Sequence, residues 1–182
     1  KTGTLTRGRP ELTDVVPAPG ADAARVLAAA AAAEARSEHP LALAIVNAAR
    51  ERGVAVADPE DFAAVPGQGV IAVLGGAVIA LGTDVLLRGQ GADPGPLAAE
   101  RERLEALGRT VAGVAENGVM LGLVAVADTL KPDAAAAVAT LSGLGHEVWM
   151  ITGDNPRTAL AVAAESGIAP ERVLAGVLPG NK

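Results

Sequence analysis

The chain has 182 residues, enough for one ordinary domain or two small ones, and half of them are apolar, so it can bury a packed core. Its net charge of −6 is scattered and leaves no basic stripe, which argues against nucleic acid and an anionic membrane surface as direct partners. It contains no cysteine and only two histidines, far apart, so disulfides and thiolate metal sites are excluded and no transition-metal site is expected.

A membrane-spanning segment is not expected. No window of about 18 residues is free of charge, proline and glycine in the way a spanning helix requires. The nearest candidate, residues 21–33, is mostly alanine, carries Asp22 and Arg25, and is too short. The opening residues also lack the apolar run of a signal peptide. We therefore expect no direct membrane insertion by this chain.

The first quarter of the chain predicts a strand followed by two helices. Residues 11–16 predict a short strand, and the proline- and glycine-rich residues 17–20 predict a linker. Asp22 is a suitable N-cap for an alanine-rich helix that extends to about residue 35. A second helix is expected from Pro40, which suits the first helical position, to residue 52, just before Gly53.

The middle of the chain consists of short apolar runs separated by turn residues, which predicts an antiparallel sheet. The dipeptides Gly75-Gly76 and Asn117-Gly118 are typical of tight hairpin turns. An amphipathic helix is expected at residues 96–107, between the two hairpins. The expected strands are residues 54–57, 62–65, 70–74, 77–81, 109–116 and 119–126.

The last third alternates helices and strands, which is typical of a parallel α/β unit. The expected elements are helix 132–144, strand 147–151, helix 156–166 and strand 172–174. The opening residues are expected to follow a strand of the same unit, so the middle domain is inserted between two segments of another domain. The expected segments are 1–12, 13–124 and 125–182, of which the first and third form one domain.

A Thr-Gly-Asp-Asn-Pro motif at residues 152–156 follows the strand that is expected to end at residue 151. Ligands bind at the carboxyl ends of parallel strands, and a helix start offers free amides to an anion. Thr152 and the amide of Gly153 are therefore candidates for holding a phosphoryl group. A turn that only caps the helix, with Asn155 as N-cap and Pro156 at the first helical position, explains the same residues.

Three further features each allow two interpretations. Lys182 is suited to neutralising phosphoryl charge, or it is a solvated terminal residue. Glu34 and His39 flank the turn between the first two helices and can orient a purine, although a histidine there also serves as a cap or a surface residue. Gly67 and Gly69 allow a flat ligand to approach the backbone, or they form a plain β-turn.

Taken together and in this order, the motifs resemble the cytoplasmic ATP-binding region of a heavy-metal-transporting P-type ATPase. The phosphorylation motif of that family is Asp-Lys-Thr-Gly-Thr-Leu-Thr, and residues 1–6 match it except for the aspartate. Residues 37–40 match its Ser-Glu-His-Pro, residues 67–69 its Gly-x-Gly, and residues 152–155 its Thr-Gly-Asp-Asn. The resemblance covers essentially the whole chain, and the Ser-Glu-His-Pro element separates this class from calcium and sodium pumps.

The resemblance implies a fold and a set of site residues. The fold is an incomplete haloacid-dehalogenase-like parallel α/β phosphorylation domain that carries an inserted nucleotide-binding domain of antiparallel sheet and helices. The implied nucleotide-binding residues are Glu34, His39, Gly67, Gly69 and Gly82. The implied catalytic residues are Lys1, Thr2, Thr152, Gly153, Asp154 and Lys182. Thr83 stands where the family has asparagine, so one side-chain amide is lost and a hydroxyl is kept.

The resemblance also implies a function for the parent protein. ATP hydrolysis through an aspartyl-phosphate, with Mg²⁺, is coupled to heavy-metal export across a membrane. Copper(I) is the expected cargo, and a zinc-, cadmium- or cobalt-type pump is the alternative. The region acts on the cytoplasmic side together with the transmembrane and actuator domains of the same transporter. Residues 128–132 resemble the hinge that returns to the phosphorylation domain, although read alone they are an ordinary loop before a helix.

The chain lacks the aspartate before Lys1 and the family's Gly-Asp-Gly-x-Asn-Asp segment. A carboxylate must attack the γ-phosphate while Mg²⁺ bridges its oxygens, so the chain by itself is expected to bind ATP or ADP without turnover. Two other classes stay open. One is a non-catalytic nucleotide-binding module. The other is a phosphatase of the same superfamily, which usually has a second acid where this chain has Thr2.

Overall fold

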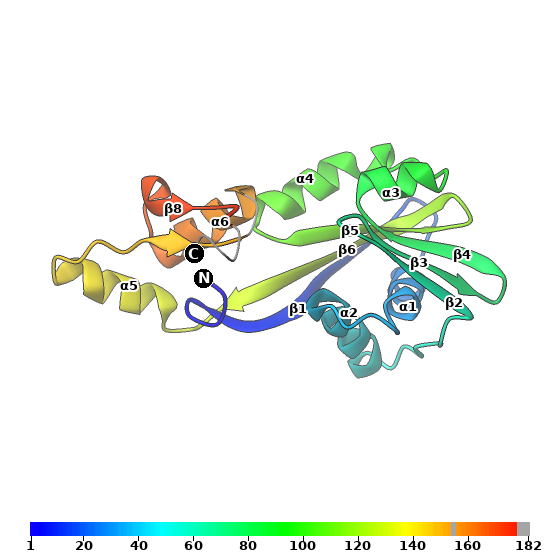
Figure 1. Cartoon of the computed structure of the whole chain (residues 1–182), viewed down its shortest axis with the longest axis horizontal. Coiled ribbons are helices and arrows are strands. Elements are labelled where there is room, and N and C mark those ends of the chain that lie inside the picture. The colour runs from blue at the N-terminus through cyan, green and yellow to red at the C-terminus, as the bar shows by residue number, and fades with distance from the viewer. Residues whose placement is uncertain (154–155, 178–182) are drawn as a thin grey trace. The chain divides into compact units, whose positions relative to one another are not determined.

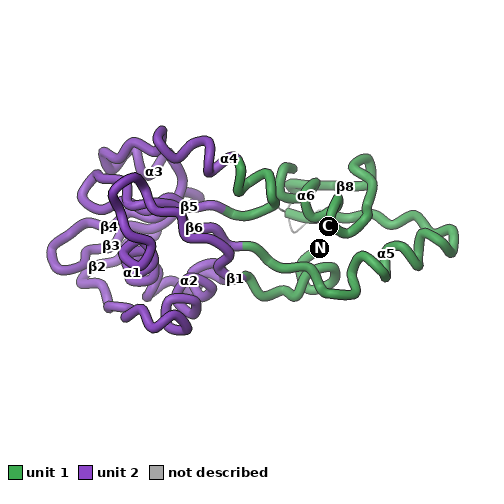
Figure 2. The backbone as a smooth tube through the Cα atoms, turned by 180° about the vertical axis from the view of Figure 1, so that it is seen from behind, with its two compact units in different colours: residues 1–10, 103–110, 127–182 green, residues 11–102, 111–126 purple. Residues whose placement is uncertain are grey.

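The computed structural model describes residues 1–153 and 156–177, and the chain divides into two compact units (Figures 1 and 2). Unit 1 consists of Lys1–Pro10, Arg103–Thr110 and Ala127–Lys182. Unit 2 consists of Glu11–Glu102 and Val111–Val126. In sequence, the larger unit therefore lies between segments of the smaller one.

A six-stranded sheet has the strand order β1-β6-β5-β4-β3-β2. Its strands are β1 (Thr6–Pro17), β2 (Asp61–Val65), β3 (Gly69–Leu74), β4 (Ala77–Gly82), β5 (Thr110–Glu116) and β6 (Val119–Leu130). From β2 to β5 each strand pairs with the next in antiparallel fashion, which confirms the expected antiparallel sheet. β1 and β6 are longer than expected. β1 begins before the first residue of unit 2, Glu11, and β6 ends after its last residue, Val126.

The two hairpins turn at the predicted dipeptides. Gly75 and Gly76 have φ angles of +58° and +77°, and Asn117 and Gly118 have φ angles of +49° and +78°. Positive φ at both central residues is the geometry of the type I′ turn, which matches the twist of the flanking strands. Asn117 adds a link to β4, because the Val78 amide donates to its Oδ1 at 2.9 Å. Both hairpin predictions are confirmed.

Helices cover both faces of the sheet in unit 2 (Figure 1). α1 (Ala23–Ala33) and α2 (Pro40–Glu51) pack on one face, against alternate side chains of β3 and β4. Five of the seven buried residues of α1 are alanine, and side chains this small allow the helix to lie close to the sheet. α3 (Asp84–Gly89) packs on the other face through Leu87, which contacts Ala80 and Ala115. A 3₁₀ turn, η1 (Gly95–Leu97), leads into α4 (Ala98–Ala106).

Unit 1 contains the expected alternation of helices and strands. Its elements are α5 (Ala134–Gly143), β7 (Met150–Ile151), α6 (Pro156–Ser166), the 3₁₀ turn η2 (Pro170–Arg172) and β8 (Val173–Leu174). β7 and β8 pair in parallel, which confirms the predicted α/β character. The core of this unit joins Val138 of α5, Met150 of β7, Val162 of α6 and Ile168, which follows α6. Within the described residues no helix has the length and apolarity needed to cross a membrane.

One predicted strand is wrong and one helix was missed. Residues 54–57 form a loop, because the edge strand β2 starts only at Asp61 and pairs with β3 alone. Val54 and Val56 nevertheless pack against the core, so their apolar pattern reflects burial and not a strand. α3 was not predicted because six residues are too few for a helical period, although Thr83 provides its N-cap.

Gly69 and Gly82 form a cross-strand pair at the end of the β3–β4 hairpin that lies away from its turn. Their φ angles are +141° and +157°. A Cβ on Gly69 would lie 2.1 Å from the Leu81 carbonyl oxygen, and a Cβ on Gly82 would lie 2.0 Å from the Gln68 carbonyl oxygen. Only glycine allows the two backbones to approach this closely.

We predict that Gly69→Ala lowers the free energy of unfolding by about 2–4 kcal/mol, because the added methyl group forces two paired strands apart. Urea unfolding of the 182-residue chain measures this change. Gly20→Ala is the matched control, since Gly20 also has a positive φ of +83° but no atom within 4 Å of the added Cβ. It is expected to cost about 1 kcal/mol. Equal losses in the two variants would contradict the proposed clash.

Candidate functional site

Glu34 directly follows α1 and is its C-cap residue. Its exposed fraction is only 7%, and its Oε2 has no hydrogen-bond partner among the residues that the structure describes. Burial raises the pKa of Glu34, while a hydrogen bond with the Ser37 side chain and the nearby charge of His39 lower the pKa. A buried carboxyl group with a free oxygen costs stability, so its presence points to an unmet partner.

His39 is the N-cap of α2, and its Nδ1 accepts the Leu41 amide at 3.2 Å. The capping alternative is therefore the one that the structure shows. The cap also determines the tautomer, because a neutral ring that accepts at Nδ1 carries its proton at Nε2. The His39 side chain is exposed, so Nε2–H is available to donate to a ligand while Nδ1 caps the helix.

The turn between Glu34 and His39 is held by local hydrogen bonds. The Ser37 amide donates to the Glu34 carbonyl oxygen at 3.0 Å, and the His39 amide donates to Ser37 Oγ at 3.4 Å. Pro40 then occupies the first helical position of α2. These bonds place the side chains of Glu34, Ser37 and His39 on one short turn, which we call the 34–39 turn.

The predicted glycines lie at one end of the β3–β4 hairpin. Gly67 is exposed, has a φ of +71° and has open space where a Cβ would be, whereas Gly69 and Gly82 are in tight contact with each other. Thr83 caps α3, since its Oγ1 accepts the Leu86 amide at 3.4 Å, and its own amide donates to the Gln68 carbonyl oxygen at 2.8 Å. α1 packs against β3 and β4, the strands that these glycines border.

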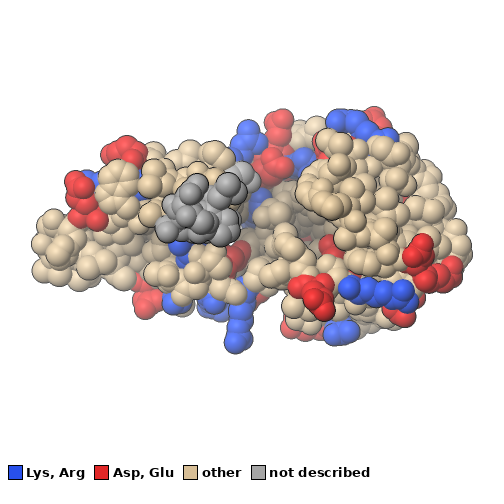
Figure 3. Space-filling view, in the orientation of Figure 1, with Lys and Arg blue, Asp and Glu red and all other residues tan. Residues whose placement is uncertain are grey.

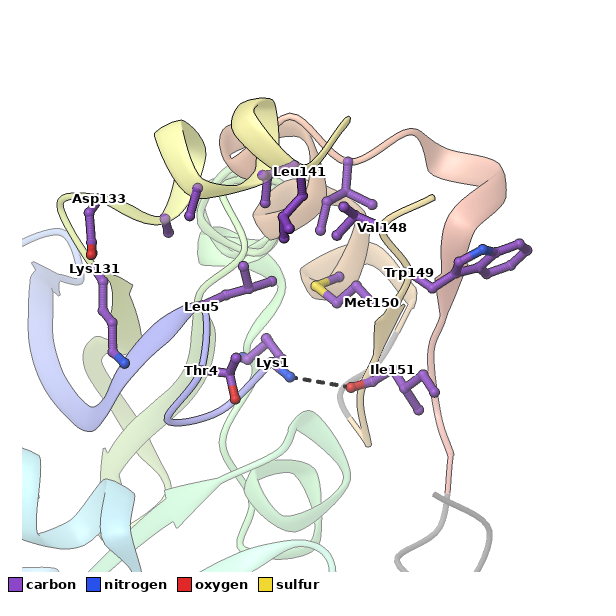
Figure 4. Close-up of a pocket in the computed structure, with 14 residues that line it drawn as sticks. Lys1, Thr4, Leu5, Lys131, Asp133, Leu141, Val148, Trp149, Met150 and Ile151 are labelled. Atoms are coloured by element: carbon purple, nitrogen blue, oxygen red, sulfur yellow. Dashed lines mark hydrogen bonds between the residues drawn. The ribbon is translucent and has the colours of Figure 1, made fainter. Parts of the chain in front are cut away.

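In unit 1, the opening residues lie beside β7 (Figure 4). The backbone nitrogen of Lys1 lies 3.4 Å from the Ile151 carbonyl oxygen, and Ile151 leads directly into Thr152. Thr152 is buried, and its amide donates to the Leu174 carbonyl oxygen in β8 at 2.9 Å. Thr2 and Gly153 are exposed. The structure thus brings Lys1 and Thr152, which are far apart in sequence, to the carboxyl end of the parallel pair.

Two predicted site residues, Asp154 and Lys182, lie outside the described residues, so their roles stay predictions. The same holds for Asn155 as an N-cap of α6. The phosphoryl-binding role of Thr152 and Gly153 is likewise a prediction, supported by their position after a parallel strand.

Asp128 is a residue that sequence reasoning identified only as part of a hinge. Its Oδ2 accepts a hydrogen bond from Thr6 Oγ1, and its Oδ1 accepts the Gly8 amide at 2.9 Å. Thr6 is completely buried. Lys131 adds two bonds, from its amide to the Leu5 carbonyl oxygen at 2.9 Å and from Nζ to the Gly3 carbonyl oxygen at 3.0 Å. An aspartate near the end of a long apolar strand was the available signal.

A pocket of about 320 Å³ lies in unit 1 between the opening residues, α5 and the segment around β7 (Figure 4). Most of its lining is apolar, from side chains such as Leu5, Leu141 and Met150, with Lys1 and Lys131 at its edge. An apolar lining does not match the charge of a triphosphate. We therefore do not assign the nucleotide to this pocket.

The comparison with protein families assigns the class. The model described as "Hydrolase: haloacid dehalogenase-like hydrolase" matches residues 1–177, and the chain belongs to this family. The fold class expected from the sequence is thereby confirmed. The parallel β7–β8 pair, with α5 and α6 packed around it, is the part of the structure with the expected α/β construction.

Among individual relatives, the chain is 47% identical over 182 residues to the "Copper-transporting ATPase 1" of Rhizobium meliloti (strain 1021). The match covers 100% of this chain and 22% of that relative, so the chain spans about a fifth of the length of the curated relative. The predicted resemblance to heavy-metal-transporting P-type ATPases is confirmed by this similarity.

Two solved structures support the same similarity. A zinc-transporting PIB-type ATPase in the E2.Pi state matches with a TM-score of 0.82 and 38% identity, over 100% of this chain and 29% of that chain. The catalytic domain of the CPx-ATPase CopB-B, described in terms of conformational changes upon nucleotide binding, matches with a TM-score of 0.67 and 26% identity. That match covers 99% of this chain and 61% of the other.

We predict that Asp128→Ala lowers the free energy of unfolding by about 1–3 kcal/mol, because buried Thr6 loses its hydrogen bond to the Asp128 carboxylate and the Gly8 amide loses its acceptor. Urea unfolding provides the measurement. Asp133→Ala is the matched control in the same unit, since Asp133 is exposed and its side chain makes no capping hydrogen bond. A change within about 0.5 kcal/mol is expected for the control. An unchanged free energy of unfolding in Asp128→Ala would show that these hydrogen bonds do not stabilise the fold.

We predict that Glu34 makes the stability of the chain depend on pH. Because its pKa is raised above the ordinary value of 4.5, its protonated form favours folding below that value, and this contribution is lost as pH rises through the folded-state pKa. Glu34→Gln cannot ionise. The stability of the wild type relative to this variant should therefore fall as the pH rises above 4.5 in urea titrations. A constant difference across this range would contradict the burial of an ionisable carboxyl group.

Proposed function

We propose that this chain is the ATP-binding region of a heavy-metal-transporting P-type ATPase and that the 34–39 turn holds the adenosine. The observation that carries the proposal is Glu34, whose buried Oε2 lacks a partner among the described residues and lies beside a Ser-Glu-His-Pro motif. An ionised carboxylate accepts hydrogen bonds, and the exocyclic amine of adenine donates them. His39 Nε2–H is a second group able to donate to the ligand.

The glycines would contribute by shape. Gly67 has no Cβ in an exposed turn, and Gly69 and Gly82 hold the hairpin end in an arrangement that other residues would not permit. This geometry leaves a flat ligand free access to the backbone. Thr83 accepts from the Leu86 amide, and its hydroxyl proton is still able to donate to a nucleotide. We therefore propose residues 13–124 as the nucleotide-binding domain.

The phosphate groups would be held by residues of the phosphorylation domain, residues 1–12 and 125–182. The proposed residues are Lys1, Thr2, Thr152, Gly153, Asp154 and Lys182. Support comes from the nitrogen of Lys1 lying 3.4 Å from the oxygen of Ile151, at the carboxyl end of a parallel strand. Lysine and threonine side chains at such an edge suit phosphoryl charge.

Mg²⁺ would neutralise phosphate charge when ATP is bound. In the parts of the chain that the structure describes, no three acidic or histidine side chains gather closely enough to hold a metal ion.

For the parent protein we propose copper export driven by ATP hydrolysis through an aspartyl-phosphate. Copper is favoured over zinc because a relative named as copper-transporting is 47% identical, whereas the zinc-transporting structure is 38% identical. The proposed partners of this region are ATP or ADP and the transmembrane and actuator domains of the same transporter. The proposed location is the cytoplasmic side of the membrane.

We predict that ATP and ADP shift the amide resonances of Glu34, His39 and Gly67–Gly69 in spectra of the 182-residue chain. Glu34→Gln and His39→Ala are each expected to raise the Kd for ATP about tenfold or more, since the first replaces a charged acceptor with a neutral one and the second removes a donor. Glu38→Gln is the matched control, because Glu38 lies in the same turn but is exposed. Unchanged spectra at millimolar ATP would contradict the proposed adenosine site.

A further inference from the structure

Arg36 joins the 34–39 turn to a distant segment of unit 2. Its Nε donates to Asp58 Oδ1 at 3.0 Å, and its Nη2 donates to Asp58 Oδ2 at 2.9 Å. Two parallel N–H···O bonds of this kind form the bidentate arrangement that guanidinium and carboxylate groups favour. Arg36 stands between Glu34 and Ser37, so this bond acts on the part of the turn that carries the proposed site.

Asp58 is a suitable anchor because its neighbours are fixed to the sheet. Pro59 follows it and is fully buried, and the Glu60 amide donates to the Val73 carbonyl oxygen in β3 at 2.8 Å. The loop thus continues the pairing of β2 with β3 by one residue. The hydrogen bonds from Arg36 to Asp58 therefore link the 34–39 turn to β3, the strand that begins at Gly69.

The charges around Arg36 reinforce this contact. The hydrogen bond to Asp58 and the charges of Asp58 and Asp61 raise the pKa of Arg36, and the bond to Arg36 lowers the pKa of Asp58. Both side chains are substantially exposed, with fractions of 43% and 74%, so the pair contributes little to global stability. Its effect is expected to be local, on the conformation of the 34–39 turn.

We propose that Arg36 and Asp58 are positioning residues for the nucleotide site: together they hold the 34–39 turn in the conformation that presents Glu34 and His39 to the ligand. This inference rests on the proposed function. In a positioning role Arg36 needs Asp58 as its partner. If Arg36 instead bound phosphate directly, the negative charge of Asp58 would weaken that binding. The chemistry of the ligand stays that of an adenine nucleotide.

The sign of the Asp58→Ala effect tests the inference. The variant removes a negative charge, so electrostatics alone predicts equal or tighter binding of anionic ATP. Positioning predicts the opposite, a Kd for ATP about two- to fivefold higher, the range that one well-formed exposed ion pair supports. Arg36→Ala should raise the Kd by a similar factor. The double variant should bind no more weakly than either single variant, because both changes break the same link.

Arg36→Lys and Arg52→Ala complete the comparison in calorimetric titrations of the 182-residue chain with ATP. Arg36→Lys keeps the charge but loses the bidentate geometry, so binding should recover only in part. Arg52→Ala removes an exposed arginine of the same unit and should leave the Kd unchanged. Unfolding midpoints in urea should be equal in all variants. A Kd that is unchanged or lower in Asp58→Ala would overturn the inference.

Amide hydrogen exchange in the free chain separates this inference from the proposed function. Arg36→Ala and Asp58→Ala should both speed exchange at Ser37 and Leu41, whose amides are bonded within the turn and its cap. Unaltered exchange at both amides would overturn the positioning role even if ATP binds the wild type. Faster exchange without any ATP binding by the wild type would support the role in the turn and refute the nucleotide site.

Discussion

One carboxylate, Asp128, accepts two hydrogen bonds that join the two segments of unit 1 between which unit 2 is inserted. A domain inserted in another requires the chain to leave and return at neighbouring points, and β1 and β6 are neighbours in the sheet. Asp128 follows the return of the chain and binds Thr6 and Gly8, which precede its departure. Because Thr6 is completely buried and Asp128 is half-buried, water competes less with the bond between them. The insertion is therefore secured by polar bonds at the base of the two strands.

A second constraint is the conflict at Glu34 between burial and charge. The alanine-rich α1 lies close to the sheet, and the side chain of its C-cap residue, Glu34, is buried. One oxygen of this carboxyl group has no hydrogen-bond partner among the described residues. Such a group is unfavourable for folding but useful for recognition, since a ligand that donates a hydrogen bond relieves the cost. The cap at His39 and the bidentate pair of Arg36 with Asp58 restrict the same turn. The proposed nucleotide contacts and these local bonds therefore fall on the same six-residue turn.

Much of the fold was predictable from local signals. Gly75-Gly76 and Asn117-Gly118 required positive φ values, Asp22 and Pro40 marked helix starts, and all of these predictions are confirmed. The predicted strand at residues 54–57 was wrong because an apolar pattern indicates burial, and a partly buried loop produces it as well as a strand does. The short helix α3 was missed because its two buried leucines are adjacent and show no period.

The sequence by itself determined the order of the elements, the family resemblance and the candidate residues, since capping, turn formation and motifs depend on residues close together in the chain. Only the tertiary structure decided which distant residues meet. It paired Gly69 with Gly82 at a distance that excludes a side chain, joined Asp128 to Thr6 and connected Arg36 to Asp58. The physical reason is that these contacts arise from strand register and helix packing, which a linear pattern of residues does not encode locally.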